Sequence, residues 1–495
     1  MLDEPRIRKE KLDRLIALGV NPYPSDSHRD ATCAEAHEFF GEWMKQRVTK
    51  TLAGRLLTIR VHGGVIFADL VDQSGKMQVA LKEGDLSEES FTMFRDLIDP
   101  GDIVEMSGIV FLTKRGEKTL EVSSWRILTK ALLPLPEKWH GLQDVEQRFR
   151  KRYLDLIMNE DVRTRLILRS RMITAMRTFL DARGYLEVET PTLQPVYGGG
   201  FAKPFKTHHN ALDVDFYLRI SDEMYLKRLI VGGCEGVYEI TKVFRNEGVD
   251  HDHNPEFTMF EAQIAYQDYR FGMDIFEEIF EHLAQTVLGR TTVQHGDATV
   301  ELKRPWKRMR MVEAIIEVGG LDVSEWKALE DAKSDLRERL SDKKARELDR
   351  MHSLGEVIAF AFEELVEEKL IQPTIIYDYP LEVSPLAKRC ADPRFTERFE
   401  AFALGSEIGN NYSELNDPID LEQRFIEEKK KEEAGFDEAH QTDYDYLEAI
   451  KHGMPPVCGI AIGVDRMAML FTGAQNIKEV IAFPTLRPEH RENES

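Results

Sequence analysis

The sequence predicts an α+β protein in which a small amino-terminal β-barrel precedes a larger domain of antiparallel strands and flanking helices. Three observations lead to this prediction. Five short runs rich in β-branched residues lie between residues 51 and 133, a proline-rich break follows at Leu133-Pro134-Leu135-Pro136, and a strand–loop–strand pattern lies near the middle of the remaining chain. With 495 residues, the chain is also too long for one hydrophobic core.

The composition indicates an ordinary globular protein rather than a membrane-spanning or disulfide-rich one. Hydrophobic residues make up 42% of the chain and charged residues 31%. No apolar run approaches membrane-spanning length, and the first residues lack the apolar segment of a signal peptide, so we expect no membrane association. The four cysteines are far apart and form no Cys-x-x-Cys pair, which indicates a reducing cytoplasm rather than a disulfide or zinc framework.

The first domain is predicted to be a five-stranded barrel behind a helical segment. Residues 1–50 are charged and follow a helical pattern, and strands are predicted at 52–60, 65–71, 76–82, 103–113 and 119–128. A helix is predicted at 88–98, between the third and fourth strands. Five strands with a helix after the third is the order of an OB-fold, so residues 51–133 are predicted to form this single-strand nucleic-acid-binding barrel.

The charge of the barrel segment decides how it could bind nucleic acid. The whole chain has 66 basic and 88 acidic residues and a net charge of −22, and residues 51–130 hold ten basic against twelve acidic residues. Recognition would therefore depend on stacking and hydrogen bonds, with Phe67 and Gln78 as candidate residues. The alternative is that Phe67 belongs to the barrel core and Gln78 is solvated surface.

Residues 134–150 are predicted to link the barrel to a second domain at 151–495. That domain begins with an amphipathic helix at 160–183, which Gly184 ends, and continues with a strand from Tyr185 to Glu189. Residues 305–371 are mostly helical in pattern and are predicted to be an insertion without a binding site.

The central strand–loop–strand pattern, Val237 to Tyr266, carries the strongest indication of a site. Side chains alternate between the two faces of a strand, so Thr258, Phe260, Ala262 and Ile264 share an apolar face. The other face carries Phe257, Met259, Glu261 and Gln263, and acidic and amide groups beside an aromatic ring are costly there unless they meet a ligand. With Arg245 and Glu247 at the loop, the hairpin suits an amino acid and a nucleotide bound side by side.

Two further segments favour a nucleotide. Gly459 to Gly463 is an apolar strand that leads into a helix, with Asp465 as the predicted N-cap and Arg466 in the first helical turn, where anions bind. A capped helix with a surface arginine is an equally good interpretation of this segment alone. Glu400 and Glu407 flank an apolar stretch, and two carboxylates beside phosphates suit Mg²⁺.

The doublet His208-His209 does not predict a metal site. Adjacent residues of a strand point to opposite faces, so the two imidazoles would not share one ion.

Taken in order, the helix and strand ending at Pro191, the segment Phe244-Arg245-Asn246-Glu247 with its return strand, and Gly463-Val464-Asp465-Arg466 resemble the three motifs of class II aminoacyl-tRNA synthetases. With the OB-fold, they resemble the subclass that serves lysine, aspartate and asparagine. The segments Ser384-Pro385-Leu386-Ala387 and Ser413-Glu414-Leu415-Asn416-Asp417 are similar to lysyl-tRNA synthetases, of the bacterial type in view of the short amino terminus. The resemblance covers essentially the whole chain and implies a catalytic domain built on an antiparallel sheet.

The resemblance implies roles for individual residues. Those implied to bind ATP are Arg245, Glu247, His253, Asn254, Phe257, Glu400 and Arg466. Those implied to bind lysine are Gly199, Glu223, Arg245, Glu261, Gln263, Asn410, Tyr412 and Glu414. Arg245 and Arg466 are the implied catalytic residues, since they neutralise phosphate charge while the lysine carboxylate attacks the α-phosphorus.

The resemblance also implies a metal and partners. Glu400 and Glu407 match the Mg²⁺ ligands of the family. The barrel positions that match readers of a uridine-rich anticodon are Arg60, Phe67, Gln78 and Glu117. The implied partners are ATP, L-lysine, tRNA(Lys) and a second copy of the chain, with the helix of the first motif at the dimer interface.

The chain departs from the family pattern at four places. Gln263 stands where a tyrosine is usual, Tyr412 replaces a phenylalanine, and Ser406 follows Gly405 where an arginine is common. The loop Asp250-His251-Asp252 is more acidic than usual. We expect weaker lysine binding from the first change rather than a new substrate.

Three alternatives remain at this stage. An aspartate or asparagine ligase of the same subclass would need cationic or amide groups where the chain has Glu261 and Glu414. A paralogue that lysylates a protein would lack the barrel. A catalytically inactive RNA-binding relative would be expected to have lost one of the two arginines Arg245 and Arg466 or the two metal-binding glutamates.

Overall fold

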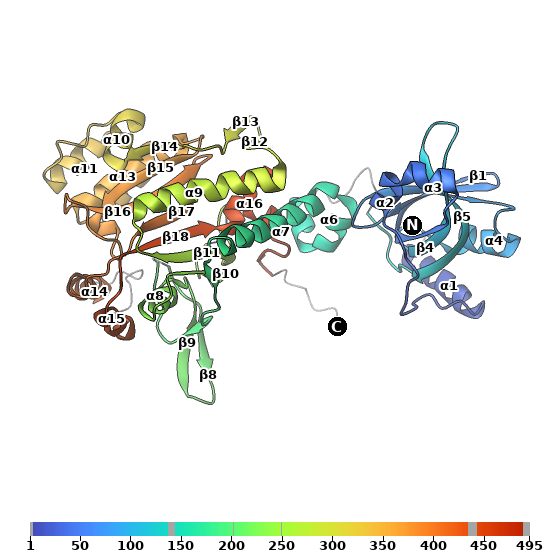
Figure 1. The fold of residues 1–495 in the computed structure, drawn as a ribbon, viewed down its shortest axis with the longest axis horizontal. Helices are drawn as coiled ribbons and strands as arrows, with labels where there is room; N and C mark the ends of the chain where they lie inside the picture. Colours follow the sequence, from blue (N-terminus) through green and yellow to red (C-terminus); the bar gives the residue numbers. More distant parts are fainter. Residues whose placement is uncertain (1–2, 137–143, 201, 249, 434–442, 489–495) are drawn as a thin grey trace. The chain divides into compact units, whose positions relative to one another are not determined.

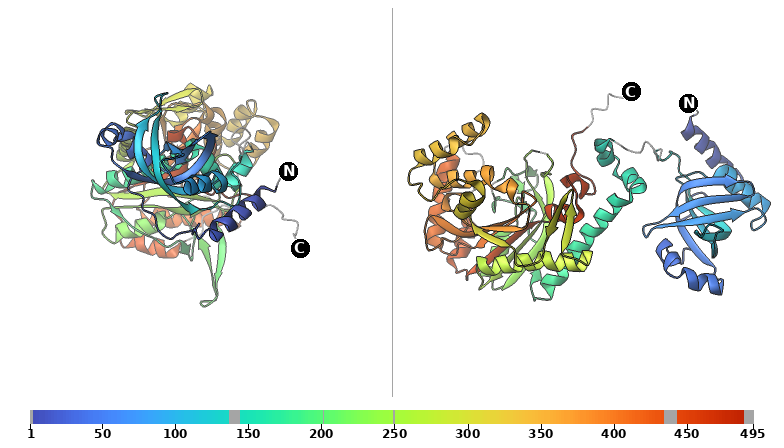
Figure 2. Two further views of the ribbon diagram at one scale, coloured as in Figure 1. Left: turned by 90° about the vertical axis from the view of Figure 1, so that its right-hand side faces the viewer. Right: turned by 90° about the horizontal axis from the view of Figure 1, so that it is seen from above.

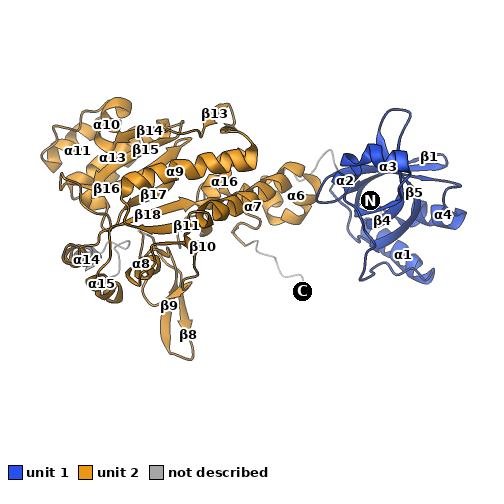
Figure 3. Cartoon of the chain, in the orientation of Figure 1, with its two compact units in different colours: residues 1–143 blue, residues 144–495 orange. Residues whose placement is uncertain are grey.

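The chain forms two compact units in a computed structural model that describes residues 3–136, 144–200, 202–248, 250–433 and 443–488. The first unit spans residues 1–143 and the second residues 144–495 (Figure 3). Each unit has a hydrophobic core of its own.

The first unit is a closed five-stranded barrel with strand order β1-β2-β3-β5-β4 (Figure 1, Figure 2). Its strands are β1 (Lys50–His62), β2 (Val65–Val71), β3 (Lys76–Lys82), β4 (Ile103–Leu112) and β5 (Lys118–Thr129). Helix α4 (Glu88–Leu97) lies between β3 and β4 in the sequence. The predicted OB-fold, with its five strands and one helix, is therefore confirmed.

The amino-terminal helices belong to the barrel unit. They are α1 (Glu4–Ala17), α2 (Cys33–Glu38) and α3 (Phe40–Gln46). Leu15, Cys33 and Phe40 are buried in the same core as barrel residues such as Leu56 and Val79. The segment predicted to precede the barrel thus supplies part of its core.

The predicted linker is shorter than expected. Residues 137–143 lie outside the described residues, while Val145–Arg150 forms helix α5 of the second unit. Asp144 caps this helix by accepting hydrogen bonds from the main-chain N–H groups of Glu146 and Gln147. The prediction that 145–150 is linker was therefore wrong, because a capped helix begins there.

The second unit is built on an eight-stranded sheet with the order β14-β15-β16-β17-β18-β11-β10-β6. Its strands are β6 (Leu186–Glu187), β10 (Gly236–Phe244), β11 (Glu256–Ala265), β14 (Lys307–Arg310), β15 (Thr374–Pro380), β16 (Phe395–Ala403), β17 (Ser406–Ser413) and β18 (Val457–Gly463). All neighbours are antiparallel except the two edge pairs, β14–β15 and β10–β6. The predicted antiparallel sheet is confirmed.

One face of this sheet is covered by two long helices that lie side by side, α7 (Glu160–Asp181) and α9 (Tyr269–Leu283) (Figure 1, Figure 2). Phe260, Ala262 and Ile264 of β11 are buried beneath them, as the alternation of the strand predicted. Helix α7 ends two residues before the predicted end, and the strand that follows is Leu186–Glu187 rather than Tyr185–Glu189.

Shorter elements frame the opposite face. At one end of the sheet lie α10 (Met311–Ala314), α11 (Leu329–Arg337), α12 (Asp342–Asp349) and α13 (Leu354–Leu365), which pack on Ile376 and Phe402. At the other end lie α8 (Glu223–Val231), α14 (Pro418–Glu433) and α15 (Tyr444–Lys451), which share a core with Val237 and Val457. The segment 305–371 is largely helical, but it begins with strand β14, because Lys307–Arg310 pairs with β15 at the sheet edge.

The remaining elements are short. Besides short 3-10 and π turns, they are α6 (Arg152–Met158), α16 (Val464–Thr472), the three-stranded sheet of β7 (Leu193–Gln194), β9 (Val214–Leu218) and β8 (Lys206–His209), and the hairpin of β12 (Thr292–His295) and β13 (Ala298–Glu301). Within the part of the chain that the structure describes, no helix is both long and apolar enough to cross a membrane.

Candidate active site

The register of four central strands gathers the polar side chains on one face. Glu261 of β11 is paired with Ala461 of β18, Ala461 with Asn410 of β17, and Asn410 with Glu400 of β16. A second row of paired positions runs from Gln263 through Gly459 and Tyr412 to Arg398. Because paired residues project to the same side of a sheet, these rows face one pocket opposite the helices α7 and α9.

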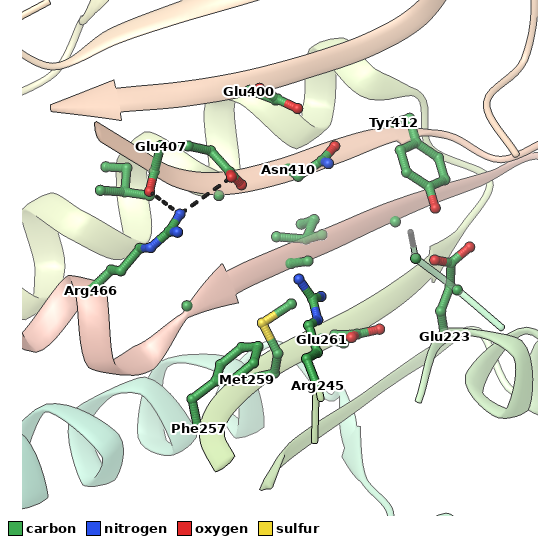
Figure 4. A pocket seen from close by; sticks show the side chains of 18 of the residues that line it. Glu223, Arg245, Phe257, Met259, Glu261, Glu400, Glu407, Asn410, Tyr412 and Arg466 are labelled. Atoms are coloured by element: carbon green, nitrogen blue, oxygen red, sulfur yellow. Dashed lines mark hydrogen bonds and ion pairs between the residues drawn. The ribbon is translucent and has the colours of Figure 1, made fainter. Parts of the chain in front are cut away.

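The pocket contains every site residue that the sequence predicted in the second unit. The residues concerned are Gly199, Glu223, Arg245, Glu247, His253, Asn254, Phe257, Glu261, Gln263, Glu400, Glu407, Asn410, Tyr412, Glu414 and Arg466. In Figure 4, Arg466 and Glu407 lie at one end of the pocket and Tyr412 and Glu223 at the other, with Arg245 between them.

The centre of the pocket is suited to an anion. Arg245 stacks on Phe257, with 5.2 Å between the guanidinium carbon and the ring centroid, and burial lowers the pKa of this arginine. Its buried Nε has no hydrogen-bond partner among the described residues. A buried guanidinium with an unused donor is costly unless a ligand supplies the acceptor, and Phe257 offers a ring face beside it.

At the first end of the pocket, Arg466 pairs with Glu407. Its Nη1 donates to the main-chain oxygen of Glu407 at 3.0 Å and lies 3.4 Å from the carboxylate, while Nη2 is 3.4 Å from Nε2 of His253. Helix α16 begins at Val464, so Arg466 lies in its first turn as predicted.

Asp465 is not the N-cap of this helix, contrary to the prediction; Gly463 holds that position. The Asp465 carboxylate instead accepts from the main-chain N–H of Thr258 at 2.7 Å and from Nη2 of Arg169 at 2.7 Å. These bonds tie α16 to β11 and to α7 and so fix the position of Arg466.

Carboxyl groups gather beside Arg466. Burial and the charge of Glu407 raise the pKa of Glu400, whose oxygens accept from Tyr379 and Arg398. Burial, together with the charges of Glu400, Glu363 and Glu407, raises the pKa of Glu367 to about 7. Carboxyl groups that repel one another in a buried site are stabilised by a divalent cation, so Glu400 and Glu407 fit Mg²⁺.

No three His, Cys, Asp or Glu side chains of the described residues converge as a metal cage would. Mg²⁺ at Glu400 and Glu407 would therefore need phosphate oxygens as further ligands, which is how this ion is commonly held beside nucleotides. His208 and His209 lie on β8, where His208 contacts Asp215.

At the second end of the pocket, a buried lysine joins two of the predicted ligand-binding carboxylates. Lys227 of α8 is 1% exposed, and its ammonium pairs with both Glu223 and Glu414. Its Nζ also lies 5.5 Å from the ring centroid of Tyr412. Burial raises the pKa of Glu414 to about 8, although Lys227 opposes this rise.

Gln263 completes this end. A Cβ atom on Gly459 would lie 2.1 Å from Oε1 of Glu414 and 2.9 Å from Nε2 of Gln263, so only glycine leaves room for both side chains over the strand. The Gln263 amide lies beside the Glu414 carboxylate and lowers its pKa, and the Oε1 of Gln263 is buried without a donor from the described residues. That oxygen is available to accept a hydrogen bond from a ligand.

Sequence patterns did not identify several residues of the pocket wall. Arg398 lines the pocket and donates from Nε to Oδ1 of Asn410 at 3.1 Å. The hydroxyl of Ser221 donates to Glu261, with distances of 2.9 and 3.0 Å to the two carboxylate oxygens. In the sequence, Lys227 and Ser221 looked like ordinary helix and loop residues. Their partners Glu414 and Glu261 come from segments distant in sequence, so no local pattern showed these contacts.

Two of the predicted nucleotide-binding residues are already engaged. Asn254 donates from Nδ2 to the main-chain oxygen of Glu256 at 2.6 Å and accepts from the main-chain N–H of Thr485 at 3.1 Å. His253 contacts Asp250 through Nδ1 at 2.9 Å. Both side chains shape the pocket edge, where Glu247 also lies exposed.

The outer face of the barrel carries the residues predicted to bind an anticodon. Arg60 is paired with Phe67 across β1 and β2, and Asp69 with Gln78 across β2 and β3. Phe67 is half-buried while its neighbours Ile66 and Ala68 are fully buried, so the alternative that Phe67 belongs to the core was wrong. Glu117 is exposed just before β5.

Comparison with known proteins agrees with this geometry. Residues 144–487 match the family of class II tRNA synthetases (D, K and N), and residues 50–128 match the OB-fold nucleic acid binding domain. The chain belongs to this synthetase family.

Individual relatives are similar over nearly their whole length. The chain is 48% identical to the lysine–tRNA ligase of Thermoanaerobacter sp. (strain X514) over 98% of this chain and 96% of that protein. It is 46% identical to the lysine–tRNA ligase of Bacillus subtilis (strain 168) over 98% and 97%. It is 47% identical to lysine–tRNA ligase 2 of Methanosarcina mazei over 97% and 93%.

Replacement of Lys227 by methionine should destabilise the second unit. The change leaves Glu223 and Glu414 buried without their cation, and breaking a buried pair in this way lowers the free energy of unfolding by about 3 kcal/mol or more. Urea unfolding without ligands measures the loss. Lys451→Met is the matched control, because Lys451 pairs with Glu422 at the surface, where the change should stay within about 0.5 kcal/mol. Equal losses for both variants would contradict the role of the buried lysine.

Proposed function

We infer that this protein is a lysine–tRNA ligase, which activates L-lysine with ATP and transfers it to the 3′-terminal ribose of tRNA(Lys). The family assignment supplies the reaction class, and the full-length lysine–tRNA ligase relatives supply the amino acid. The observation in the structure that carries the choice of lysine is the acidic end of the pocket around Glu223, Glu261 and Glu414.

The charges of the pocket balance those of lysine. When ionised, Glu223, Glu261 and Glu414 bring three negative charges, and the cations Lys227 and Arg245 offset two of them. One negative charge remains, and L-lysine with both amino groups protonated carries a net charge of +1. Aspartate would add a further negative charge to a buried acidic site, and asparagine would leave the excess charge unpaired, so both are disfavoured.

We propose the following contacts between the pocket side chains and the two substrates, ATP and lysine. Arg245, at the centre, holds the lysine carboxylate and the ATP α-phosphate together, while Phe257 stacks on the adenine. Arg466 lies at the far end and binds the γ-phosphate, and Glu247, His253 and Asn254 border the nucleotide. In the bound lysine, the α-amino group would contact Gly199 and Glu223, and the carboxylate would contact Asn410. The ε-ammonium would contact Glu261, Gln263 and Glu414, and the aliphatic chain would lie along Tyr412.

The reaction then needs positioning and charge neutralisation rather than a covalent enzyme intermediate. The lysine carboxylate oxygen forms a bond to the α-phosphorus as the bond to the pyrophosphate oxygen breaks, and the two arginines oppose the charge that gathers on the phosphates. Mg²⁺ held by Glu400 and Glu407 would neutralise further phosphate charge. The adenylate then passes lysine to the ribose hydroxyl of tRNA.

We propose that the barrel reads the anticodon of tRNA(Lys) through Phe67, Gln78, Arg60 and Glu117. A half-buried aromatic ring between polar groups is the arrangement on which single-stranded bases stack in OB-folds. Thr119 donates to Oε1 of Gln78 at 2.9 Å, which leaves the amide N–H groups of Gln78 directed away from that contact. A homodimer that includes α7, and a location in the cytoplasm where tRNA is charged, complete the proposal.

The other candidate functions fit less well. Arg245, Arg466, Glu400 and Glu407 are all present in one pocket, which a catalytically inactive relative would not need to retain. A protein-lysylating paralogue without an anticodon barrel is opposed by the closed barrel of the first unit.

The departures from the family pattern change individual contacts of the pocket but leave its acidic lysine end in place. Burial and the charge of Glu223 raise the pKa of the Tyr412 hydroxyl, a polar group that a phenylalanine would not bring to this end of the pocket. Gln263 keeps an acceptor oxygen at the ammonium end. Ser406 and the loop at Asp250 lie outside the contacts that define the lysine end.

Glu261→Gln should raise the KM for lysine about tenfold or more, because a hydrogen bond to a charged group is lost, and should leave the KM for ATP within about twofold. Amino-acid-dependent ATP–pyrophosphate exchange measures both constants. Glu256→Gln, at the exposed start of the same strand, is the control and should change neither. Equal increases in both constants would contradict a contact with the lysine side chain.

The same variant should reduce a pH dependence, of which Glu414, with its pKa raised by burial to about 8, supplies the remainder. Burial and the charge of Glu223 raise the pKa of Glu261 to about 7, and only the ionised carboxylate attracts an ammonium group. Lysine remains protonated over this range, so the KM for lysine should fall as the pH rises from about 6 to about 8 in the native protein. A parallel fall in Glu261→Gln would show that another group is responsible.

Phe67→Ala should reduce tRNA charging by about tenfold, because a stacked base is worth about 1–3 kcal/mol. Lysine-dependent ATP–pyrophosphate exchange without tRNA should be unaffected, since Phe67 lies in the barrel and the pocket lies in the second unit. Leu18→Ala, an exposed apolar residue of the first unit, is the control. Loss of exchange as well as charging would contradict the proposal that the barrel binds tRNA while the second unit alone forms the adenylate.

A further inference from the structure

Asp222 is a fully buried carboxyl group behind the lysine end of the pocket. It precedes Glu223 at the start of α8 and is 0% exposed. No donor from the described residues reaches either of its carboxyl oxygens. An aspartate at this position of a helix usually caps it, but the side chain of Asp222 makes no such bond. A role in helix capping therefore does not explain the residue.

Arg219, the cation whose charge acts on Asp222, is already paired with other groups. Arg219 donates from Nη1 to Glu239 at 2.8 Å, from Nε to the main-chain oxygen of Lys242 at 2.9 Å, and from Nη2 to Thr241. Its charge is thus matched by Glu239, which is paired with Glu261 across β10 and β11. An ionised Asp222 would be a second buried negative charge without a partner, which costs several kcal/mol.

A proton on the Asp222 carboxyl group would remove the cost of this second buried charge. Burial and the neighbouring charges of Glu261 and Glu239 raise the pKa of Asp222 well above its ordinary value, against the opposing charge of Arg219. Asp222 and Glu261 are within hydrogen-bonding reach of each other, and two carboxyl groups can bond only if one of them carries a proton. Glu261 also accepts from Ser221, whose oxygen in turn accepts from the main-chain N–H of Glu223 at 3.1 Å.

We propose that Asp222 is a positioning residue for lysine recognition, and that it shares one proton with Glu261 so that the pair carries a single negative charge and Glu261 is held toward the pocket. Ser221 and Asp222 would then fix the Glu261 carboxylate from two sides, with its remaining lone pairs directed at the substrate ammonium.

The proposal rests on the inferred lysine specificity but adds a condition to it. The charge balance of the pocket holds only if Asp222 contributes no charge, because an ionised Asp222 would leave two negative charges to be met by one lysine. The groups that face the pair are Glu239, Arg219, Glu223 and Arg245.

The proton can be observed directly by infrared difference spectroscopy of the full-length protein at neutral pH. The band from the carbonyl stretch of protonated carboxylic acids should lose intensity in Asp222→Asn relative to the native protein, while other buried carboxyl groups such as Glu414 keep their contribution. Asp443→Asn is the matched control: Asp443 caps α15 and pairs with Arg228 at 2.7 Å, and its replacement should leave that band unchanged. A band unchanged by Asp222→Asn would overturn the proposal.

Kinetics of ATP–pyrophosphate exchange test the positioning role. Asp222→Asn keeps an N–H donor for Glu261 and should raise the KM for lysine by no more than about threefold, whereas Asp222→Ala should raise it about tenfold with little change in the KM for ATP. Equal increases for lysine and ATP, or equal effects of the two variants, would show a structural role only and overturn the proposal.

The two experiments separate this proposal from the function on which it rests. If Asp222→Ala does not fold, the spectrum of Asp222→Asn still decides whether the proton is present. The spectrum needs no substrate, so the band can be found even if the native protein shows no exchange with lysine; that result would count against the inferred function alone.

Discussion

The structure depends on the antiparallel register of β11, β18, β17 and β16. This register places Glu261, Asn410 and Glu400 in one row on the pocket face, and it turns Phe260, Ile462 and Phe399 toward the helices on the other face. A shift of one residue in any pair would exchange the two faces, burying carboxylates in the core and exposing its largest apolar side chains. The hydrophobic core beneath α7 and α9 therefore fixes the positions of the groups that we propose bind substrate.

The electrostatic design of the pocket follows from this scaffold. One end gathers Glu400, Glu407 and Arg466, which suits phosphates with a divalent cation, while the other end gathers Glu223, Glu261 and Glu414. The acidic end would be unstable on its own, and the protein offsets it with a buried ammonium on Lys227 and a bond from Ser221. What remains is an incompletely compensated negative charge, which a cationic amino acid would neutralise in the function we propose. The same uncompensated charge would thus supply both the affinity for the amino acid and the preference for a cationic side chain.

Much of this could be predicted from the sequence, and the parts that could not share a physical reason. The alternation of β11 predicted both of its faces correctly because strand periodicity is a local property, and the barrel strands were placed to within two residues for the same reason. Asp465 was misassigned as an N-cap because its true partners, Arg169 and the main-chain N–H of Thr258, come from elements far away in sequence. Lys227 and Asp222 were missed because nothing in the local pattern of α8 shows that one ammonium is buried between two carboxylates or that one aspartate does not cap its helix.

The most direct test of the account is ATP–pyrophosphate exchange by the purified protein with Mg²⁺ and each standard amino acid in turn, without tRNA. Exchange with lysine alone is expected, because the similar full-length proteins are lysine–tRNA ligases and the net charge of lysine matches the negative charge left by Glu223, Glu261 and Glu414. Exchange with aspartate or asparagine, or no exchange with any amino acid, would contradict it.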